Sequence, residues 1–527
     1  MQIKCIIRPN EYHDSVFLMG VARQAGKLPG VQRAALGMGT VMNKGLLKDM
    51  ELYDEAVEKA APNDLMIALR VENDEAFAAA QAEIERRLKE KHVARASTGG
   101  GAPESRTIAM ARAADPGLNL AMISLPGEYA AAEAAKALSQ GLNVYMFSDD
   151  ISHEDERMLK QLAREKNLLM MGPGCGLTFV QQTAVGLASK VLPGPIGLIA
   201  ASGSGLQETM VQIDLMGSGV SQGIGTGGRD LRDEIGGITT LQSMDILEAD
   251  PDTKVIVLIS KPPGKKTVET VLERVRRCKK PVVVNFIGGS PEAVAAAGAH
   301  FAATFEETAA RAVALALGKP YQPRDFSMSD AGAKDLVARE HAGYGSGQRF
   351  LRGIFCGGTL AEEAMMIMRA TLPEIHSNTA VMPEFALKDA RVSEAHSVID
   401  IGTEEFTRGL PHAAIDPAPR IERFNAEAAD PSVAVILLDF LLGYGCHADP
   451  CGMMAAPIAD AIAAAKKAGR RLTVVASICG TEHDPQRLSA QKQKLLDAGA
   501  IVMPSNAQAS RLAGMIASAF QPMKNGK

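Results

Sequence analysis

The chain has 527 residues, of which 46% are apolar and 22% are charged, and its formal net charge is −5. At about 150 residues per domain, this length predicts three or four domains. The composition is typical of a soluble globular protein and excludes a strongly basic surface, so no nucleic-acid partner is expected.

The apolar segments are too interrupted for a membrane span. The longest lies near Ile196 and is broken by Gly197, Gly203 and Gly205, whereas a spanning helix needs about 20 apolar residues. The first residues, MQIKCIIRPNEYHD, lack the apolar stretch of a secretory signal. We therefore expect a cytoplasmic protein with no membrane contact and with its 7 cysteines reduced.

Residues 1–92 are predicted to form a small α+β domain. Its apolar runs indicate strands at 4–9, 31–38 and 64–71, and a helix covers 14–29. A charged helix at 75–90 carries an apolar stripe of Ala78, Ile84 and Leu88. The glycine-rich stretch that follows, residues 95–106, indicates a domain boundary.

Residues 93–190 alternate between strand and helix. Apolar strands are expected at 118–127, 142–150 and 168–176, with helices between them. Ser152 is expected to cap the second of these helices, because Asp155 follows three residues later. Alternating buried strands and helices favour a parallel, Rossmann-like sheet covered on both faces.

Residues 191–320 continue the alternation, and residues 349–521 repeat it. Four landmarks keep their order in the two copies: Gly197 with Gly353, Gly225 with Gly402, Asp250 with Asp430, and Gly298 with Gly499. Chance similarity between glycine-rich turns is the alternative explanation. Residues 319–348, rich in glycine, serine and charge, are interpreted as a linker.

Six glycine-rich turns follow apolar strands, at 172–176, 202–205, 223–229, 288–289, 357–359 and 443–446. Such a turn either binds phosphate or carboxylate through its amides or only makes the tight connection that the fold needs. The Ser202–Gly205 turn favours a ligand because it has two hydroxyls and a helix directly behind it. No GxxxxGK[ST] motif and no strand-to-helix GxGxxG motif occurs, so neither a P-loop nor a nicotinamide site is supported.

Three further positions have both a functional and a structural interpretation. Arg229, followed by Asp230, either holds an anionic substrate or forms an exposed ion pair. Lys261 ends a strand, at the edge where open α/β sheets bind ligands. Cys175 either has a lowered thiol pKa or is a small residue that fits a turn.

The Cys446–Cys451 stretch lacks zinc-site spacing, so no metal is expected.

These motifs resemble the succinyl-CoA synthetases. Residues 93–318 are similar to the α subunit, with its CoA-binding and first ligase domains, through LPGEYAAAEA, MGPGCG, GLIAASGSGLQE, GIGTGGRD and KKPVVVNFIGG. Residues 349–520 are similar to the carboxyl-terminal domain of the β subunit, through DIGTEE, VAVILLDFLLGYGCHAD and LTVVASICG. The layout as a whole is closest to FdrA proteins. The resemblance implies a Rossmann-like domain followed by two flavodoxin-like domains.

The departures from synthetases bear on mechanism. Ala296 stands where the synthetases carry a phosphorylated histidine, and His300 is expected to point elsewhere. Lys261 stands near the position of the glutamate that supports that histidine. The ATP-grasp half of the β subunit has no counterpart. Only Ser97, Thr98, Gly99 and Gly100 loosely match the CoA loop, so CoA is a candidate ligand and no cofactor is required.

The resemblance also implies a phosphate site between two helix amino termini. The matching positions are Gly174, Cys175 and Gly176 on one side, and Gly443, Tyr444, Gly445 and Cys446 on the other, with Ser202, Gly203, Ser204 and Gly205 beside them. Lys261, Ser204 and Arg229 are the expected catalytic residues.

The resemblance to FdrA proteins implies a subunit of an oxamate carbamoyltransferase in ureide breakdown. Its substrates would be the anions carbamoyl phosphate and oxamate, and its partners other subunits encoded nearby. An acyl-CoA synthetase subunit and a non-catalytic scaffold subunit are the alternatives.

Overall fold

The computed structural model describes residues 2–98, 105–345, 347–407 and 410–518. The chain divides into two compact units, Met1–Ser105 with Thr403–His412, and Arg106–Gly402 with Ala413–Lys527. No helix within the described ranges combines the length and the apolar character that crossing a membrane requires.

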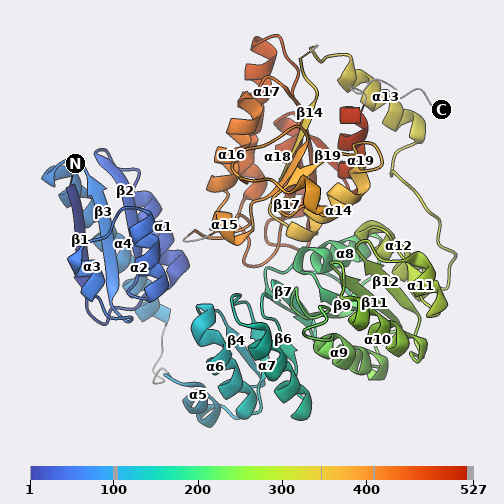
Figure 1. Cartoon of the computed structure of the whole chain (residues 1–527), viewed down its shortest axis with the longest axis horizontal. Coiled ribbons are helices and arrows are strands. Elements are labelled where there is room, and N and C mark those ends of the chain that lie inside the picture. Colours follow the sequence, from blue (N-terminus) through green and yellow to red (C-terminus); the bar gives the residue numbers. More distant parts are fainter. Residues whose placement is uncertain (1, 99–104, 346, 408–409, 519–527) are drawn as a thin grey trace. The chain divides into compact units, whose positions relative to one another are not determined.

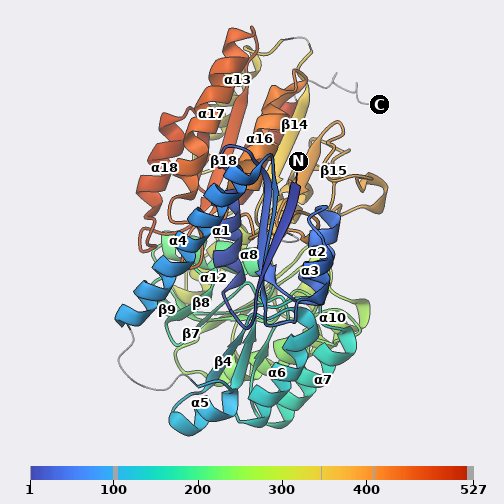
Figure 2. The same cartoon turned by 90° about the vertical axis from the view of Figure 1, so that its left-hand side faces the viewer.

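The first unit is built on a three-stranded antiparallel sheet with both faces covered (Figure 1). Alternate residues of the central strand point to opposite faces. Ile67 and Leu69 join a core with helices on one face, and Met66 and Ala68 join a second core on the other. The strands, in sheet order, are β1 (Gln2–Arg8), β3 (Leu65–Val71) and β2 (Val31–Met38). The helices are α1 (Ser15–Ala25), α2 (Val41–Asp49), α3 (Glu55–Lys59) and α4 (Asp74–Thr98), the long helix in Figure 2.

The second unit begins with a three-stranded parallel sheet and its helices. The order is β4 (Leu120–Ile123), β5 (Asn143–Met146) and β6 (Met170–Met171), with α5 (Ile108–Ala114), α6 (Gly127–Ser139) and α7 (His153–Glu165). The predicted cap is confirmed, since the Ser152 hydroxyl accepts the Asp155 amide at 3.0 Å. Ala-rich α6 packs its small side chains close to the sheet.

A seven-stranded sheet follows, and five of its strands are parallel. In sheet order it contains β13 (His300–Phe301), β12 (Val282–Phe286), β11 (Val255–Ser260), β9 (Pro193–Ala201), β10 (Val220–Gly225), β7 (Leu177–Val180) and β8 (Thr183–Gly186). The antiparallel strands β7 and β8 extend it at one edge. Its helices are α8 (Gly203–Leu215), α9 (Ile238–Ala249), α10 (Lys265–Arg276), α11 (Pro291–Ala296) and α12 (Phe305–Ala316).

A six-stranded parallel sheet forms the last part. Its order is β15 (His376–Ser377), β16 (Ser397–Asp400), β14 (Phe350–Phe355), β17 (Val433–Leu441), β18 (Thr473–Cys479) and β19 (Ile501–Met503). The helices include α14 (Gly358–Met368), α16 (Ala418–Ala429), α17 (Pro450–Lys467), α18 (Leu488–Asp497) and α19 (Asn506–Ser518). The parallel strands of the first large sheet have the order 2-1-3-4-5, and those of the second have the same order when the two-residue edge strand β15 is left out. This shared flavodoxin-like order confirms the predicted fold class and its repeat.

The interpretation of residues 319–348 as a linker is wrong for part of that stretch. Helix α13 (Asp330–His341) begins at Ser329, whose side chain caps it. The Glu340 carboxylate is buried and accepts hydrogen bonds from Arg471 and Thr473, each at 2.8 Å. The polar composition of this segment gave no signal for a buried helix, because the main contacts of α13 are the polar ones that Glu340 makes with Arg471 and Thr473.

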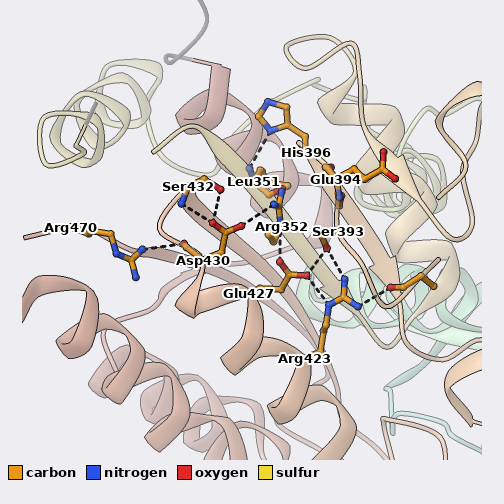
Figure 3. Close-up of polar contacts among 12 residues, drawn as sticks. Leu351, Arg352, Ser393, Glu394, His396, Arg423, Glu427, Asp430, Ser432 and Arg470 are labelled. Carbon is orange, nitrogen blue, oxygen red and sulfur yellow. Dashed lines mark hydrogen bonds and ion pairs between the residues drawn. The ribbon is translucent and has the colours of Figure 1, made fainter. Parts of the chain in front are cut away.

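A buried ionic network lies at the amino-terminal edge of the second large sheet (Figure 3). Arg352 on β14 pairs with Glu427 at 2.9 Å and with Asp430 at 3.4 Å. Arg423 also binds Glu427, at 2.7 Å. Burial and the nearby Arg352 lower the pKa of His396 to about 4, so this histidine is neutral and accepts the Leu351 amide. The charges of this network satisfy one another, which is typical of a structural cluster.

Candidate functional site

Two equivalent strand-to-helix turns meet at the carboxyl edges of the large sheets. Ser202 caps α8 by accepting the Gly205 amide at 3.1 Å. The same hydroxyl donates to Thr359 Oγ1 at 2.9 Å, in the first turn of α14. The turn that faces Ser202 is therefore Gly357–Thr359, the corresponding turn of the second copy.

The amino terminus of α8 keeps unused hydrogen-bond donors. Among the described residues, the amides of Gly203 and Ser204 and the Ser204 hydroxyl have no hydrogen-bond partner. Gly176 packs against this turn, and a Cβ on Gly203 would lie 3.7 Å from the Gly176 Cα. Free amides and the positive end of the α8 dipole together make an anion site.

The other residues of the 174–176 turn are already engaged. The amides of Gly174 and Cys175 donate to the carbonyls of Ser148 at 2.9 Å and Met146 at 3.1 Å. Burial raises the pKa of the Cys175 thiol to about 12, and its sulfur donates to two backbone carbonyls. Cys175 is thus a small residue that fits a turn and no activated nucleophile.

Carboxylates fill the amino terminus of α14. The Cys356 and Gly357 amides donate to the two oxygens of Asp439, each at 2.8 Å, and Arg420 binds the same carboxylate at 3.0 Å. Asp400 lies against Gly358. Burial, its largest cause, raises the Asp400 pKa to about 7. Two amides of this turn are already paired with a carboxylate, which favours α8 as the helix that binds an exogenous anion.

Lys261 joins the two flavodoxin-like parts. Ser260 pairs in register with Ala201, so Lys261 lies beside Ser202 at the sheet edge. Its ammonium binds Glu362 of α14 at 2.6 Å. The pair lines a cavity of about 280 Å³ together with Gly228, Arg232, Ser260 and Thr379. Lys261 is thus held by a carboxylate across the interface.

Arg229 is directed toward the Rossmann-like part. Its guanidinium binds Glu156 at 3.0 Å and the Ile151 carbonyl at 3.0 Å. Glu156 also holds the fully buried Lys160, which binds Asp230. Arg229 and Asp230 therefore do not form the exposed ion pair considered for them: they have different partners in a largely buried network that joins α7 to the turn after β10.

The loop of Gly443, Tyr444, Gly445 and Cys446 packs on the segment after β8. The Tyr444 amide donates to the Ala188 carbonyl at 2.9 Å, and the Gly443 amide to Gln486 at 3.0 Å. Burial raises the pKa of the Cys446 thiol to about 12. From α8, Gln207 reaches the Leu442 carbonyl at 2.7 Å. These contacts brace the flank of α8, while the turn at 357–359 faces its amino terminus.

The expected CoA loop falls partly outside the described residues. Ser97 and Thr98 are the last residues of α4, and Gly99 and Gly100 are not described. A helix therefore stands where a pyrophosphate-binding loop would follow a strand. Within the described ranges, the sheet of β4, β5 and β6 has no strand from before Leu120.

His300 lies away from the α8 turn. It is exposed on β13 and pairs with Val283, which is level with Val257 and Leu198. That level is three residues, about 10 Å, short of Ala201, and β12 and β11 lie between. Ala296 ends α11. His300 is therefore no substitute for a phosphorylated histidine at this edge.

The sequence did not point to three side chains around the site, Arg232, Glu362 and Asp439, and it gave the turn of Thr359 no partner. Glu362 and Asp439 contact residues far away in the chain, as with Lys261 and Glu362. The repeat was the signal that could have found Thr359, because equivalent turns of two copies of one fold meet when the copies pack about a twofold axis.

Family models match three stretches of the chain. Residues 1–105 match "AllF, heavy metal-associated domain", residues 193–318 match "Succinyl-CoA ligase like flavodoxin domain", and residues 354–516 match "CoA-ligase". Among the described residues, no group of three or more histidine, cysteine or acidic side chains is arranged to hold a metal ion.

The relatives of this chain differ in how much of it they match. YahF of Escherichia coli is 43% identical over 97% of this chain and 98% of its own length. The malate–CoA ligase α subunit of Methylorubrum extorquens is 29% identical over 40% of this chain and 74% of its own. A succinate–CoA ligase α subunit of Archaeoglobus fulgidus is 27% identical over 31% and 57%. The chain therefore belongs to the FdrA-like family of YahF, with an AllF-type domain joined to succinyl-CoA-ligase-like domains.

Proposed function

We propose that the chain is the phosphate-handling subunit of a carbamoyltransferase complex that acts on carbamoyl phosphate and oxamate in ureide catabolism. The observation that carries the proposal is the α8 amino terminus, where the described amides of Gly203 and Ser204 have no partner, while His300, the histidine that follows Ala296 most closely in the chain, lies away from that turn. The FdrA resemblance supplies the substrates.

The reaction suits such a site. The oxamate amide nitrogen attacks the carbamoyl carbon and loses one proton. The bond from that carbon to the bridging oxygen breaks, and phosphate leaves with the bonding electrons. Negative charge on the departing phosphate grows toward the α8 amides, which stabilise it without reorganisation. Ser204 supplies a hydroxyl donor in the same turn, and no cofactor is required.

The malate–CoA and succinate–CoA ligase relatives support a second candidate, an acid–thiol ligase subunit. That reaction needs a phosphate carrier or a nucleotide site on another subunit, because Ala296 has no nucleophile and His300 is remote from α8. A scaffold subunit, the third candidate, makes no use of the α8 donors.

The test is phosphate release from carbamoyl phosphate by the complex purified with its genomic neighbours, with and without oxamate. Losing one preorganised donor typically costs about 10²-fold in rate, so Ser204→Ala is expected to slow oxamate-dependent release by about that factor. Ser139→Ala, an exposed serine at the end of α6, is the control and should leave the rate unchanged.

Two outcomes would reject this function. Full activity of both Ser204→Ala and Lys261→Ala complexes would indicate a scaffold. Product formation that needs ATP, CoA and an organic acid, without phosphate release from carbamoyl phosphate, would indicate a ligase.

A further inference from the structure

Three buried carboxyl groups meet where the two flavodoxin-like parts pack on each other. Glu208 lies on α8, Glu363 on α14 and Glu306 on α12, and each residue is 7% exposed or less. Residues 505–508, at the start of α19, donate hydrogen bonds of 2.6 to 3.2 Å to all three. Four helices from both parts therefore depend on one acidic cluster.

This cluster contains very little positive charge. Among the residues that the structure describes, the cation in contact with it is Arg324, which lies 3.5 Å from Glu306 and is 55% exposed. The donors to Glu208 and Glu363 are neutral: the Asn506 and Phe305 amides, and the side chains of Asn506, Gln212 and Cys479. The Oδ1 atom of Asn506 is also buried, and it accepts no hydrogen bond. The cluster thus has more acceptors than donors.

Protons on the carboxyl groups would correct both deficits. A buried carboxyl group without a cation is more stable when it is neutral, and its proton turns an acceptor into a donor. Burial is the largest cause that raises the pKa of Glu208 to about 7 and that of Glu363 to about 8. In the packed arrangement both groups therefore hold a proton below this range and lose it as the pH rises through it.

The two glutamates occupy equivalent positions in the repeat. Each lies five residues after the first residue of its helix, which is Gly203 in α8 and Gly358 in α14, so each is about 7.5 Å along the helix from that residue. These are the helices whose amino termini meet through the hydrogen bond from Ser202 to Thr359. An anion at the α8 turn would therefore lie close to both carboxyl groups, in an interior where salt screens charges weakly.

We propose that Glu208 and Glu363 form a proton-linked switch, which couples the packing of α8 against α14 to anion binding at the α8 amino terminus. When both groups are neutral, the helices pack and the contact between Ser202 and Thr359 keeps the α8 turn in place. When both are ionised, the carboxylates repel each other and any anion at the turn. The proposal rests on the anion site of the proposed function and not on its substrates.

The sign of the coupling follows from linkage. Because the arrangement that binds the anion holds more protons, anion binding takes up protons, and the affinity falls as the pH rises. Glu306 and Cys479 are the titratable groups that face the two glutamates. Burial raises the pKa of the Cys479 thiol well above its ordinary value, so this group stays neutral.

Asp400 is a competing source of pH dependence. It lies against Gly358 at the amino terminus of α14, and burial, the largest cause, raises its pKa to about 7. The other charged groups near this turn are engaged, since Asp439 binds Arg420, and Lys261 binds Glu362. Asp400 therefore needs a variant of its own.

Sulfate binding to the full chain in its complex tests the switch without catalysis. Sulfate stays a dianion from pH 6 to pH 9, so only groups of the protein titrate. We expect calorimetry to show an affinity that falls about fivefold or more over this range, as is typical of coupled sites. At pH 8, two buffers with different ionisation enthalpies should reveal proton uptake by the wild type. Ser204→Ala should weaken sulfate binding at pH 6, whereas Ser139→Ala should not.

Variants then assign the protons. The double variant Glu208→Gln, Glu363→Gln is permanently neutral and should bind sulfate equally well at pH 6 and pH 9. Asp400→Asn should keep the pH dependence, as should Glu422→Gln, at an exposed position on α16. An undiminished pH dependence in the double variant, or its loss in Asp400→Asn, would overturn the proposal. If the double variant does not fold, the proton count decides, because sulfate binding without proton uptake by the wild type overturns the switch.

The outcomes separate the switch from the proposed function. Sulfate binding that does not change with pH would overturn the switch alone. Proton-linked sulfate binding by a complex that releases no phosphate from carbamoyl phosphate would reject the transferase and leave the switch in place. No sulfate binding at pH 6, or equal binding by the Ser204→Ala and Ser139→Ala complexes, would overturn the switch together with the α8 anion site.

Discussion

Lys160 is a cation with no exposed side-chain surface. Its ammonium donates to Glu156 at 2.8 Å, to Asp230 at 2.7 Å and to the Thr226 carbonyl at 2.9 Å, so all three donors are used. Because Glu156 lies on α7 and Asp230 follows β10, one side chain joins the Rossmann-like part to the first flavodoxin-like sheet.

Removing this cation should be costly. Lys160→Met removes the ammonium that two buried carboxylates share, and such a loss typically costs about 3–5 kcal/mol. We expect urea denaturation to show a decrease of that size in the free energy of unfolding. Lys166→Met, at an exposed position after α7, should change it little. Equal changes in the two variants would contradict the role of the network.

At the scale of elements, the two flavodoxin-like parts cap each other's last helices. Glu208 on α8 accepts the amide of Asn506, the first residue of α19, at 3.2 Å. Glu363 on α14 accepts the amide of Phe305, the first residue of α12, at 2.6 Å. Burial is the largest cause that raises the pKa of Glu208 to about 7 and that of Glu363 to about 8.

The raised pKa values of Glu208 and Glu363 predict that the stability of the folded state depends on pH. The folded state holds more protons than the unfolded state between the ordinary carboxyl pKa and about 8, so its stability falls as pH rises through that window. We expect the Tm of the full chain to fall between pH 6 and pH 9. Glu363→Gln should reduce this change of Tm with pH, whereas Glu422→Gln, at an exposed position on α16, should leave it unchanged. A Tm slope that Glu363→Gln leaves intact would contradict this origin.

Elements were predictable from the sequence where local signals decide them. The Ser152 cap and the alternation of strands and helices depend on patterns within single segments; the cap forms as predicted, and the alternating strands build parallel sheets. Helix α13 was not predicted, because its apolar stripe is short and Arg471, which binds it, lies far away in the chain. The partners of Arg229 and Lys261 were unpredictable for the same reason, since ion pairs between distant segments leave no spacing in the chain.

At the scale of the whole molecule, the chain consists of two units with separate cores. Separate cores predict separate unfolding transitions in calorimetry. Leu69 is fully buried in the first unit, and Leu69→Ala typically costs about 2–5 kcal/mol. The substitution should lower the unfolding temperature of the first unit and leave that of the second unit unchanged. A common shift of all transitions would contradict independent units.

In the function that we propose, α8 binds the phosphate of a transferred carbamoyl group. This role is tested by the rate of phosphate release from carbamoyl phosphate by the complete complex, with and without oxamate, for the wild type, Ser204→Ala and Ser139→Ala. We expect release that depends on oxamate, falls by about 10²-fold in Ser204→Ala and is unchanged in Ser139→Ala. Release that is independent of oxamate, or equally fast in all three complexes, would contradict it.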